Sequence, residues 1–134
     1  MKISCLIILI LAFCTCNRDK TDYPNAENAF DAGREFIDGC LKGDFKKAAF
    51  YMVNDGENNK DLQQIEKNYN AKTIEQKQQY HEASIIVNED EAVSDSVHVI
   101  NYMNAYDKIA RKIKVILHNG IWQVDFKYTF NGNL

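Results

Sequence analysis

Hydrophobic spacing between residues 25 and 53 predicts two helices that follow each other closely. Apolar and small residues recur at steps of three and four, which places them along one helical face. The first stripe is Ala26, Ala29, Phe30, Gly33, Ile37, Cys40 and Leu41. Asn25 suits its N-cap, and Gly43 suits the left-handed position that ends many helices. Asp44 is then expected to cap a second helix over residues 45–53.

The polar stretch that follows is harder to interpret. The composition of residues 54–60 (NDGENNK) predicts a loop, and Asp61 could cap a third helix whose stripe is Leu62, Ile65 and Tyr69. Residues 72–80 are polar nearly all round, so the pattern leaves open whether that helix extends through residues 74–79.

After Tyr80 the hydrophobic period changes to two, which is typical of strands. We expect strands at residues 83–88, 92–102, 108–118 and 121–130, with a turn at 88–91. Asn119-Gly120 predicts a two-residue hairpin, because a type I′ turn needs positive φ at both central positions. This turn would pair His118 with Ile121, Leu117 with Trp122, Val115 with Val124, Ile113 with Phe126, Arg111 with Tyr128, and Ile109 with Phe130. The pairs from Leu117 with Trp122 onward share one face of the hairpin, which is mostly apolar. The whole pattern predicts an α+β fold of two or three N-terminal helices on a four-stranded antiparallel sheet.

The first sixteen residues resemble a bacterial lipoprotein signal. Lys2 precedes an apolar run over residues 3–13, which is shorter than the about 20 residues of a membrane span. Lipoprotein leaders end at a cysteine that becomes acylated, after a Leu and two small residues. Cys16 follows Phe13, Cys14 and Thr15 and fits better than Cys14, which bulky Phe13 precedes directly. We therefore expect a leader at 1–15, lipidation of Cys16 with Cys14 as the alternative, a polar tether at 16–24 and one domain at 25–134.

Composition narrows the range of functions. The chain has 134 residues, with 16 basic and 19 acidic side chains and a net charge of −3. This mild acidity argues against nucleic acid as a partner, because binding phosphates needs a basic surface. His81, His118 and Cys40 lack the spacing of metal ligands, and no phosphate-binding glycine loop or nucleophile elbow occurs. We therefore expect neither a metal nor a cofactor.

The order of elements, together with two short motifs, resembles the nuclear transport factor two-like (SnoaL-like) superfamily. The motifs are Lys42-Gly43-Asp44-Phe45 at the helix junction and Gly120-Ile121-Trp122-Gln123-Val124 at the last hairpin. Small bacterial lipoproteins of unknown function in this superfamily carry the same leader and motifs. The resemblance covers nearly all of residues 25–130. It implies a curved sheet that wraps the first helix and leaves a conical cavity, which some members use for catalysis and others for binding.

The implied cavity gives six candidate lining residues, with Arg111 and Tyr128 near the mouth. The set is Tyr51, His98, Arg111, Trp122, Phe126 and Tyr128. Arg111 faces inward and needs a partner, which could be an anionic ligand or a carboxylate of the protein itself. His98 would face the cavity opposite Arg111 if residues 104–105 form a two-residue loop, and would face outward if the loop has three residues.

These residues favour a function in binding over one in catalysis. We expect an envelope-anchored lipoprotein, on the outer membrane, whose domain binds a small apolar or weakly anionic molecule or an envelope protein. We assign no catalytic residue. The alternative is an isomerase, dehydratase or cyclase with His98 or Asp55 as the base. A third interpretation is a pure interaction module, in which the open sheet face or residues 54–60 meet a partner. It predicts an apolar surface patch and no pocket.

Overall fold

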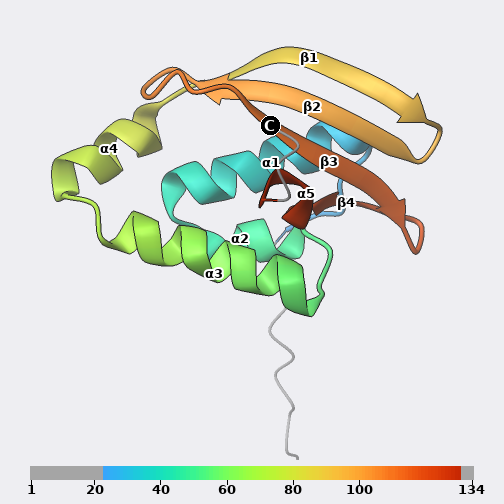
Figure 1. Ribbon diagram of the computed structural model, residues 1–134, viewed down its shortest axis with the longest axis horizontal. Coiled ribbons are helices and arrows are strands. Elements are labelled where there is room, and N and C mark those ends of the chain that lie inside the picture. The colour runs from blue at the N-terminus through green and yellow to red at the C-terminus, as the bar shows by residue number, and fades with distance from the viewer. Residues whose placement is uncertain (1–22, 131–134) are drawn as a thin grey trace, which may run out of the picture.

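The computed structural model describes residues 23–130, and these form helices on one face of an antiparallel sheet (Figure 1). The expected leader, the expected lipidation site and most of the expected tether lie outside the described residues. The helices are α1 (Ala29–Lys42), α2 (Phe45–Phe50), α3 (Gly56–Asn70), α4 (Ile74–Glu82) and α5 (Lys127–Phe130). The strands are β1 (Ile85–Ser94), β2 (Val97–Asn104), β3 (Arg111–His118) and β4 (Ile121–Asp125), in the order β1-β2-β3-β4. The predicted α+β class is therefore confirmed, although the sheet is not strongly curled.

The junction of the first two helices forms as predicted. Gly43 ends α1 with φ of 74°, and the Asp44 carboxylate accepts a hydrogen bond from the Lys47 backbone amide at 3.0 Å as the cap of α2. The start of α1 differs, since Asn28 and not Asn25 caps it by accepting from the Asp31 amide at 2.8 Å. The second helix is shorter than expected and ends at Phe50.

Residues 51–53 leave α2 early because they pair with the sheet. The Val124 amide donates to the Tyr51 carbonyl at 2.8 Å, and the Val53 amide donates to the Val124 carbonyl at 2.9 Å. The isolated bridge between Met52 and Val124 is parallel. This short segment covers the β4 edge of the sheet with backbone hydrogen bonds.

The predicted loop at 54–60 is wrong, because α3 begins inside it. Asp55 caps α3 by accepting from the Asn58 amide at 2.8 Å, so the polar residues after it form the first helical turns. The expected cap, Asp61, lies within the helix. The third helix does not extend through residues 74–79. These residues belong to a separate helix, α4, which starts at a capping box between Thr73 and Gln76.

The last hairpin has the predicted register over its first five pairs. Asn119 and Gly120 have φ of 51° and 76°, and Leu117 pairs with Trp122. The pairing ends at Lys114 and Asp125, so the predicted pairs of Ile113 with Phe126, Arg111 with Tyr128 and Ile109 with Phe130 do not form.

A buried polar cluster turns the chain after Asp125. The Asp125 carboxylate lies 2.7 Å from the ammonium groups of both Lys114 and Lys127. Fully buried Asn58 accepts a hydrogen bond from the Lys127 amide at 2.7 Å, which joins the start of α3 to the start of α5. Phe126 then turns inward and packs on Phe36, with ring centroids 4.9 Å apart. These contacts replace the final strand pairs that alternation alone predicted.

The turn predicted at 88–91 is also wrong. β1 runs through these residues to Ser94, with a register shift between Val87 and Glu89, and the chain reverses at residues 95–96. Acidic side chains are common on edge strands because they discourage pairing with other chains. A polar composition therefore indicated a turn where the protein has an edge strand.

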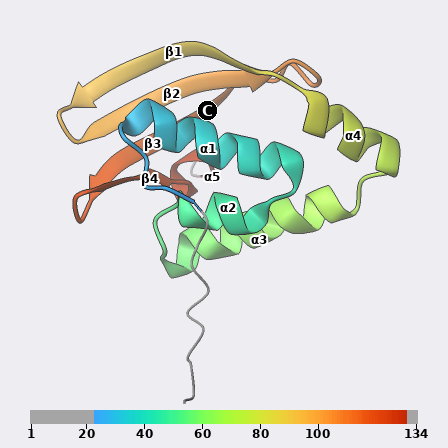
Figure 2. The same cartoon turned by 180° about the vertical axis from the view of Figure 1, so that it is seen from behind.

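The core lies between α1 and the sheet. Figures 1 and 2 show α1 running between the sheet on one side and α2 with α3 on the other. Gly33 makes this close approach possible, because a Cβ atom there would lie 2.7 Å from the Ile100 side chain. Ile100, Ile113, Val115 and Val124 supply the sheet side of the core.

Candidate functional site

Two hollows flank α1 on opposite faces of the helix. At 100° per residue, the α1 residues that line one of them point nearly opposite to those that line the other. The first hollow, the apolar cleft, has a volume of about 420 Å³ and takes Phe36, Ile37, Cys40 and Leu41 from α1. The second, the charged groove, has a volume of about 590 Å³ and takes Asp31, Arg34, Glu35, Asp38 and Lys42.

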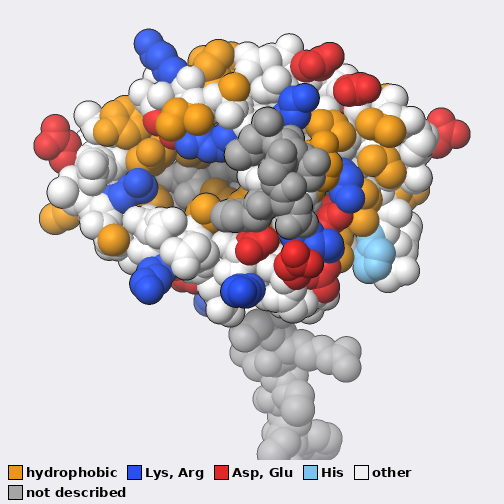
Figure 3. All heavy atoms as spheres, in the orientation of Figure 1, with side chains coloured by type: hydrophobic (Ala, Val, Ile, Leu, Met, Phe, Trp, Pro, Cys, Tyr) orange, Lys and Arg blue, Asp and Glu red, His pale blue; other side chains and the backbone are white. Residues whose placement is uncertain are grey.

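The apolar cleft opens between the C-terminal half of α1, α3, the turn into α4 and the β2–β3 loop. Figure 3 shows this hollow left of centre, above α3 and beside α4 in the orientation of Figure 1. Its other lining residues are Ile65, Asn68, Tyr69, Lys72, Tyr80, Tyr102, Asn104, Asp107, Ile109, Ala110, Arg111, Phe126 and Thr129. Aromatic and aliphatic side chains therefore form most of the wall, and a few polar groups converge on it.

Asp107 is the centre of the polar contacts on one side of this cleft. Its carboxylate accepts two hydrogen bonds from Arg111, at 2.7 and 3.1 Å, and one from the Tyr80 hydroxyl at 3.3 Å. The Ile109 amide donates a further bond at 2.9 Å. Burial alone would raise the pKa of Asp107, but the bonds from Arg111, Ile109 and Asn104 outweigh it and lower the pKa to about 2. Asp107 is therefore an ionised, fully engaged acceptor.

Tyr102 differs from the other tyrosines of the cleft because it is buried and its hydroxyl has no hydrogen-bond partner among residues 23–130. The residue is 8% exposed, it lies in β2 opposite Arg111, and it lines the cleft. Within the described residues, no fully buried side-chain polar atom is without a partner. The Tyr102 hydroxyl therefore reaches the space of the cleft. Burial raises the pKa of Tyr102, so the group keeps its proton and is a hydrogen-bond donor at neutral pH.

The turn between α3 and α4 supplies the outer wall. The Lys72 ammonium lies 4.7 Å from the centroid of the Tyr80 ring, and Tyr80 meets Tyr106 edge to face at 4.9 Å. The Lys77 ammonium lies 5.6 Å from the centroid of the Tyr69 ring. Aromatic rings and lysine side chains thus hold α4, which contains no buried residue.

The floor of the cleft includes Cys40 on α1. Burial raises the pKa of its thiol to about 12, so the sulfur is a neutral thiol at physiological pH. Cys40 therefore behaves as a small apolar residue here, as its place in the apolar stripe of the sequence predicted.

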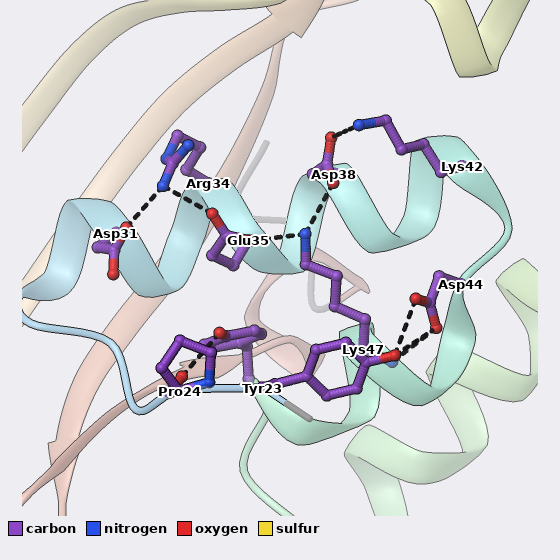
Figure 4. A network of polar contacts seen from close by, with 10 residues as sticks. Tyr23, Pro24, Asp31, Arg34, Glu35, Asp38, Lys42, Asp44 and Lys47 are labelled. Atoms are coloured by element: carbon purple, nitrogen blue, oxygen red, sulfur yellow. Dashed lines mark hydrogen bonds and ion pairs between the residues drawn. The ribbon is translucent and has the colours of Figure 1, made fainter. Parts of the chain in front are cut away.

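The charged groove on the other face of α1 is larger, but its charges satisfy one another. Figure 4 shows the chain of contacts along α1 and across to α2. The Lys47 ammonium lies 2.5 Å from Glu35 and 2.8 Å from Asp38, and Arg34 lies 2.8 Å from Asp31 and 2.6 Å from Glu35. A ligand would have to displace these pairs, so the groove is a poorer candidate than the apolar cleft despite its larger volume.

The N-terminal end of the described chain is fastened along the same groove. The Tyr23 hydroxyl donates to the Asp44 carboxylate, at 2.9 and 3.1 Å from its two oxygens. The Tyr51 hydroxyl donates to the Pro24 carbonyl at 2.8 Å. Tyr51, a candidate for the cavity, therefore lies in the charged groove and not in the apolar cleft.

Of the six candidate residues, only Arg111 and Phe126 line the apolar cleft. Arg111 faces the helices, as expected, and finds its partner in a carboxylate of the protein, which was one of the two alternatives. It pairs across the sheet with Tyr102 and not with Tyr128. Tyr128 lies on α5, with the Lys114 ammonium 5.5 Å from its ring centroid.

His98 and Trp122 lie together outside both hollows. His98 pairs with Val115, which places it on the helix-facing side of the sheet, as the two-residue loop would, although the actual loop is residues 105–110. Its Nδ1 atom is 2.8 Å from the Asp90 carboxylate, and its ring meets Trp122 edge to face at 5.6 Å. Asp55, the other candidate base, caps α3 and lies 2.9 Å from the Lys127 ammonium.

Sequence reasoning missed Tyr102, Asp107 and Tyr80, and one signal could have identified part of this group. An arginine that faces a core needs a carboxylate, and Asp107 lies four residues before Arg111. Nothing in the pattern could place Tyr80 beside them, because that contact depends on the separate helix α4.

No helix within residues 23–130 is long and apolar enough to span a membrane, and no group of three or more His, Cys, Asp or Glu in that part of the chain is arranged to hold a metal ion. A comparison of the chain with protein-family models, with curated proteins and with solved structures finds no match. The structure shows an α+β domain with N-terminal helices packed on a four-stranded antiparallel sheet.

Proposed function

We propose that this protein is a lipid-anchored binding protein of a bacterial cell envelope, and that its apolar cleft takes up a small, mainly apolar molecule. The observation that carries the proposal is the cleft itself. Its volume of about 420 Å³ lies within the range of small-molecule sites, and its largely apolar wall with a few converging polar groups is typical of them.

The arrangement of elements supports a relationship to the nuclear transport factor two-like superfamily. That superfamily has its cavity between the first helix and the sheet, and the apolar cleft lies beside α1 with Tyr102 and Arg111 of the sheet in its wall. The weakly curled sheet departs from the expected cone. The relationship therefore remains part of the proposal.

The proposed role is binding without catalysis, because the cleft lining within residues 23–130 holds no suitable base. Asp107 is its one carboxylate among the described residues, and a pKa of about 2 makes that group a weak base at neutral pH. His98 and Asp55 lie outside the cleft and are engaged with Asp90 and Lys127. No contact among the described residues favours the alternative of an isomerase, dehydratase or cyclase. A pure protein-interaction module is also less favoured, because it predicted no pocket.

Binding can be tested with the neutral apolar dye N-phenyl-1-naphthylamine, whose fluorescence rises in an apolar site. We expect saturable binding by the purified protein. Ala110→Trp places a large ring at the exposed edge of the cleft and should weaken binding about tenfold or more, since the dye loses its space. Ala49→Trp, on the exposed side of α2, is the matched control and should bind as the wild type does. No saturable binding by the wild type, or equal binding by Ala110→Trp, would count against the cleft.

The proposed anchor can be tested separately in cells. Cys16→Ala should move the protein from the membrane fraction to the detergent-free soluble fraction, because the acyl chains would be lost. Cys14→Ala is the matched control and should leave the protein in the membrane. The opposite result would assign the anchor to Cys14, and acylation of neither residue would overturn the lipoprotein assignment.

A further inference from the structure

We propose that the molecule bound in the apolar cleft is an anionic amphiphile, with a hydrocarbon body and a single carboxylate-like head that accepts a hydrogen bond from Tyr102. This inference deepens the function proposed above and rests on it. It comes from comparing the hydrogen-bond donors of the cleft with its acceptors.

Tyr102 supplies the hydrogen-bond donor of the cleft. Its side chain is more than nine-tenths buried, and its hydroxyl points into the cleft without a partner among the described residues. A buried hydroxyl that makes no hydrogen bond costs free energy unless a ligand or water completes it. The group therefore marks a position at which a bound molecule gains by presenting an acceptor.

The acceptor side is already occupied. Asp107 accepts from Arg111, from the Tyr80 hydroxyl and from the Ile109 amide. Asn104 offers its side-chain oxygen to the amides of Tyr106 and Asp107, at 3.0 and 2.9 Å. A ligand that brings donors would find these oxygens saturated. The Tyr102 hydroxyl is available to a ligand acceptor, and its own oxygen can also accept, so the charge of the cleft decides which head group is preferred.

The charge of the cleft points in the same direction. Arg111 and Asp107 lie 2.7 Å apart and largely cancel. Lys72 also lines the cleft, and its ammonium lies over the Tyr80 ring. In the described part of the chain, no carboxylate lies within 4 Å of that ammonium. One uncompensated positive charge remains, so an anionic head is favoured and a cationic head is disfavoured. The apolar floor of Phe36, Ile37 and Leu41 then suits a hydrocarbon body.

The direct test compares three ligands with the same ten-carbon chain: decanoate, decan-1-ol and decylammonium. Isothermal titration calorimetry of the purified protein, below the concentrations at which the ligands form micelles, gives the three dissociation constants. We expect decanoate to bind about tenfold tighter than decan-1-ol, because a charge-assisted hydrogen bond is stronger than a neutral one. Decylammonium should bind most weakly.

Two variants locate the head group. Tyr102→Phe keeps the ring and removes the hydroxyl, and it should weaken decanoate binding about 10-fold or more, since a bond to a charged group is lost. Lys72→Gln should reduce the preference for decanoate over decan-1-ol and leave decan-1-ol binding unchanged. Lys46→Gln, an exposed lysine of α2 outside the cleft, is the matched control and should change neither ligand. Circular dichroism confirms that each variant is folded.

The outcomes separate this inference from the function on which it rests. Equal affinities for the three ligands, all sensitive to Ala110→Trp, would overturn the anionic head and keep the apolar cleft as a binding site. Tighter binding of decylammonium, or decanoate binding that Tyr102→Phe leaves unchanged, would also overturn the inference. If the dye binds in the cleft and none of the three ligands does, the proposed ligand class is wrong, whereas loss of dye binding as well removes the proposed function itself.

Discussion

Polar side chains lie beside both faces of α1, but they have partners within the protein on one face and open positions on the other. Along the charged groove, Lys47 and Arg34 are each held by two carboxylates of the same network. On the face of the apolar cleft, Tyr102 keeps an open donor and Lys72 has no carboxylate partner among the described residues. The charged groove is the larger hollow, yet the apolar cleft is the better candidate for a binding site. Paired charges indicate a structural role, while an unpaired buried donor indicates a position at which a ligand gains by accepting a hydrogen bond.

The largest expected effect concerns the wall shared by the cleft and the core. Phe36→Ala should lower the free energy of unfolding by about 3–5 kcal/mol, because the fully buried ring packs on Phe126 and its loss leaves a cavity. Urea denaturation measures the change. Phe30→Ala, on the same helix but 41% exposed, is the control and should cost less than about 1 kcal/mol. Similar losses in the two variants would break the assignment of this face of α1 to the core.

A smaller loss is expected when the polar centre of the cleft is altered. Asp107→Asn should destabilise the protein by about 2 kcal/mol at pH 7, because half-buried Arg111 loses its anionic partner. The measurement is the free energy of unfolding in urea. An unchanged stability would mean that Arg111 finds a different anion, and it would weaken the contrast between the two faces.

The pH dependence of the stability of Asp107→Asn is a second test of the contact between Asp107 and Arg111. The pKa of Asp107 in the folded protein is about 2, below the ordinary value of 3.8, so its contribution to stability is present above about pH 4. This contribution is lost as the pH falls towards 2. The difference between wild type and Asp107→Asn should therefore be constant from pH 7 to about 5 and shrink between about pH 4 and 2. Urea denaturation at each of these pH values measures the difference in free energy of unfolding between the two proteins. A difference that stays constant down to pH 2 would show that the pKa of Asp107 is not lowered in the folded protein.

The smallest effects are expected in the charged groove. Lys47→Met should cost about 1 kcal/mol, because the 16% exposed ammonium bridges two carboxylates of α1. Lys42→Met, whose side chain is 45% exposed and pairs with Asp38 alone, should change the stability by less than about 0.5 kcal/mol. Thermal unfolding distinguishes the two. A loss for Lys42→Met as large as that for Lys47→Met would show that exposure does not govern the strength of this network.

The sequence predicted correctly those parts of the fold that depend on contacts between neighbouring residues. Gly43, Asp44 and the Asn119-Gly120 turn have backbone or capping requirements that a few neighbouring residues fulfil, so the helix junction and the hairpin register followed from them. Alternation of apolar residues failed at Phe126, because Asp125 and Asn58, 67 positions apart in sequence, meet there and turn the chain. The polar run from Asn88 to Glu91 was taken for a turn because composition does not distinguish a turn from an exposed edge strand.

The candidate site was less predictable than the fold for the same reason. The inward direction of Arg111 follows from strand periodicity, which needs no knowledge of distant contacts. Phe126 lies beyond the end of β4 and faces inward because the chain turns after Asp125. Tyr51 faces the other hollow because its hydroxyl bonds the backbone of Pro24, and His98 lies too far along the sheet to reach the cleft wall. The open donor of Tyr102 is visible only when every surrounding partner has been assigned.

The attachment of Tyr23 to Asp44, and of Pro24 to Tyr51, has a mechanical consequence. Tension applied to the chain ahead of residue 23 would load the two ends of α2 first, through these two hydroxyl contacts. Because the apolar cleft lies on the opposite side of α1, such a load would reach its walls only after the anchoring contacts had given way. A protein held by its N-terminal end could thus be pulled without deforming the hollow that we assign to its ligand.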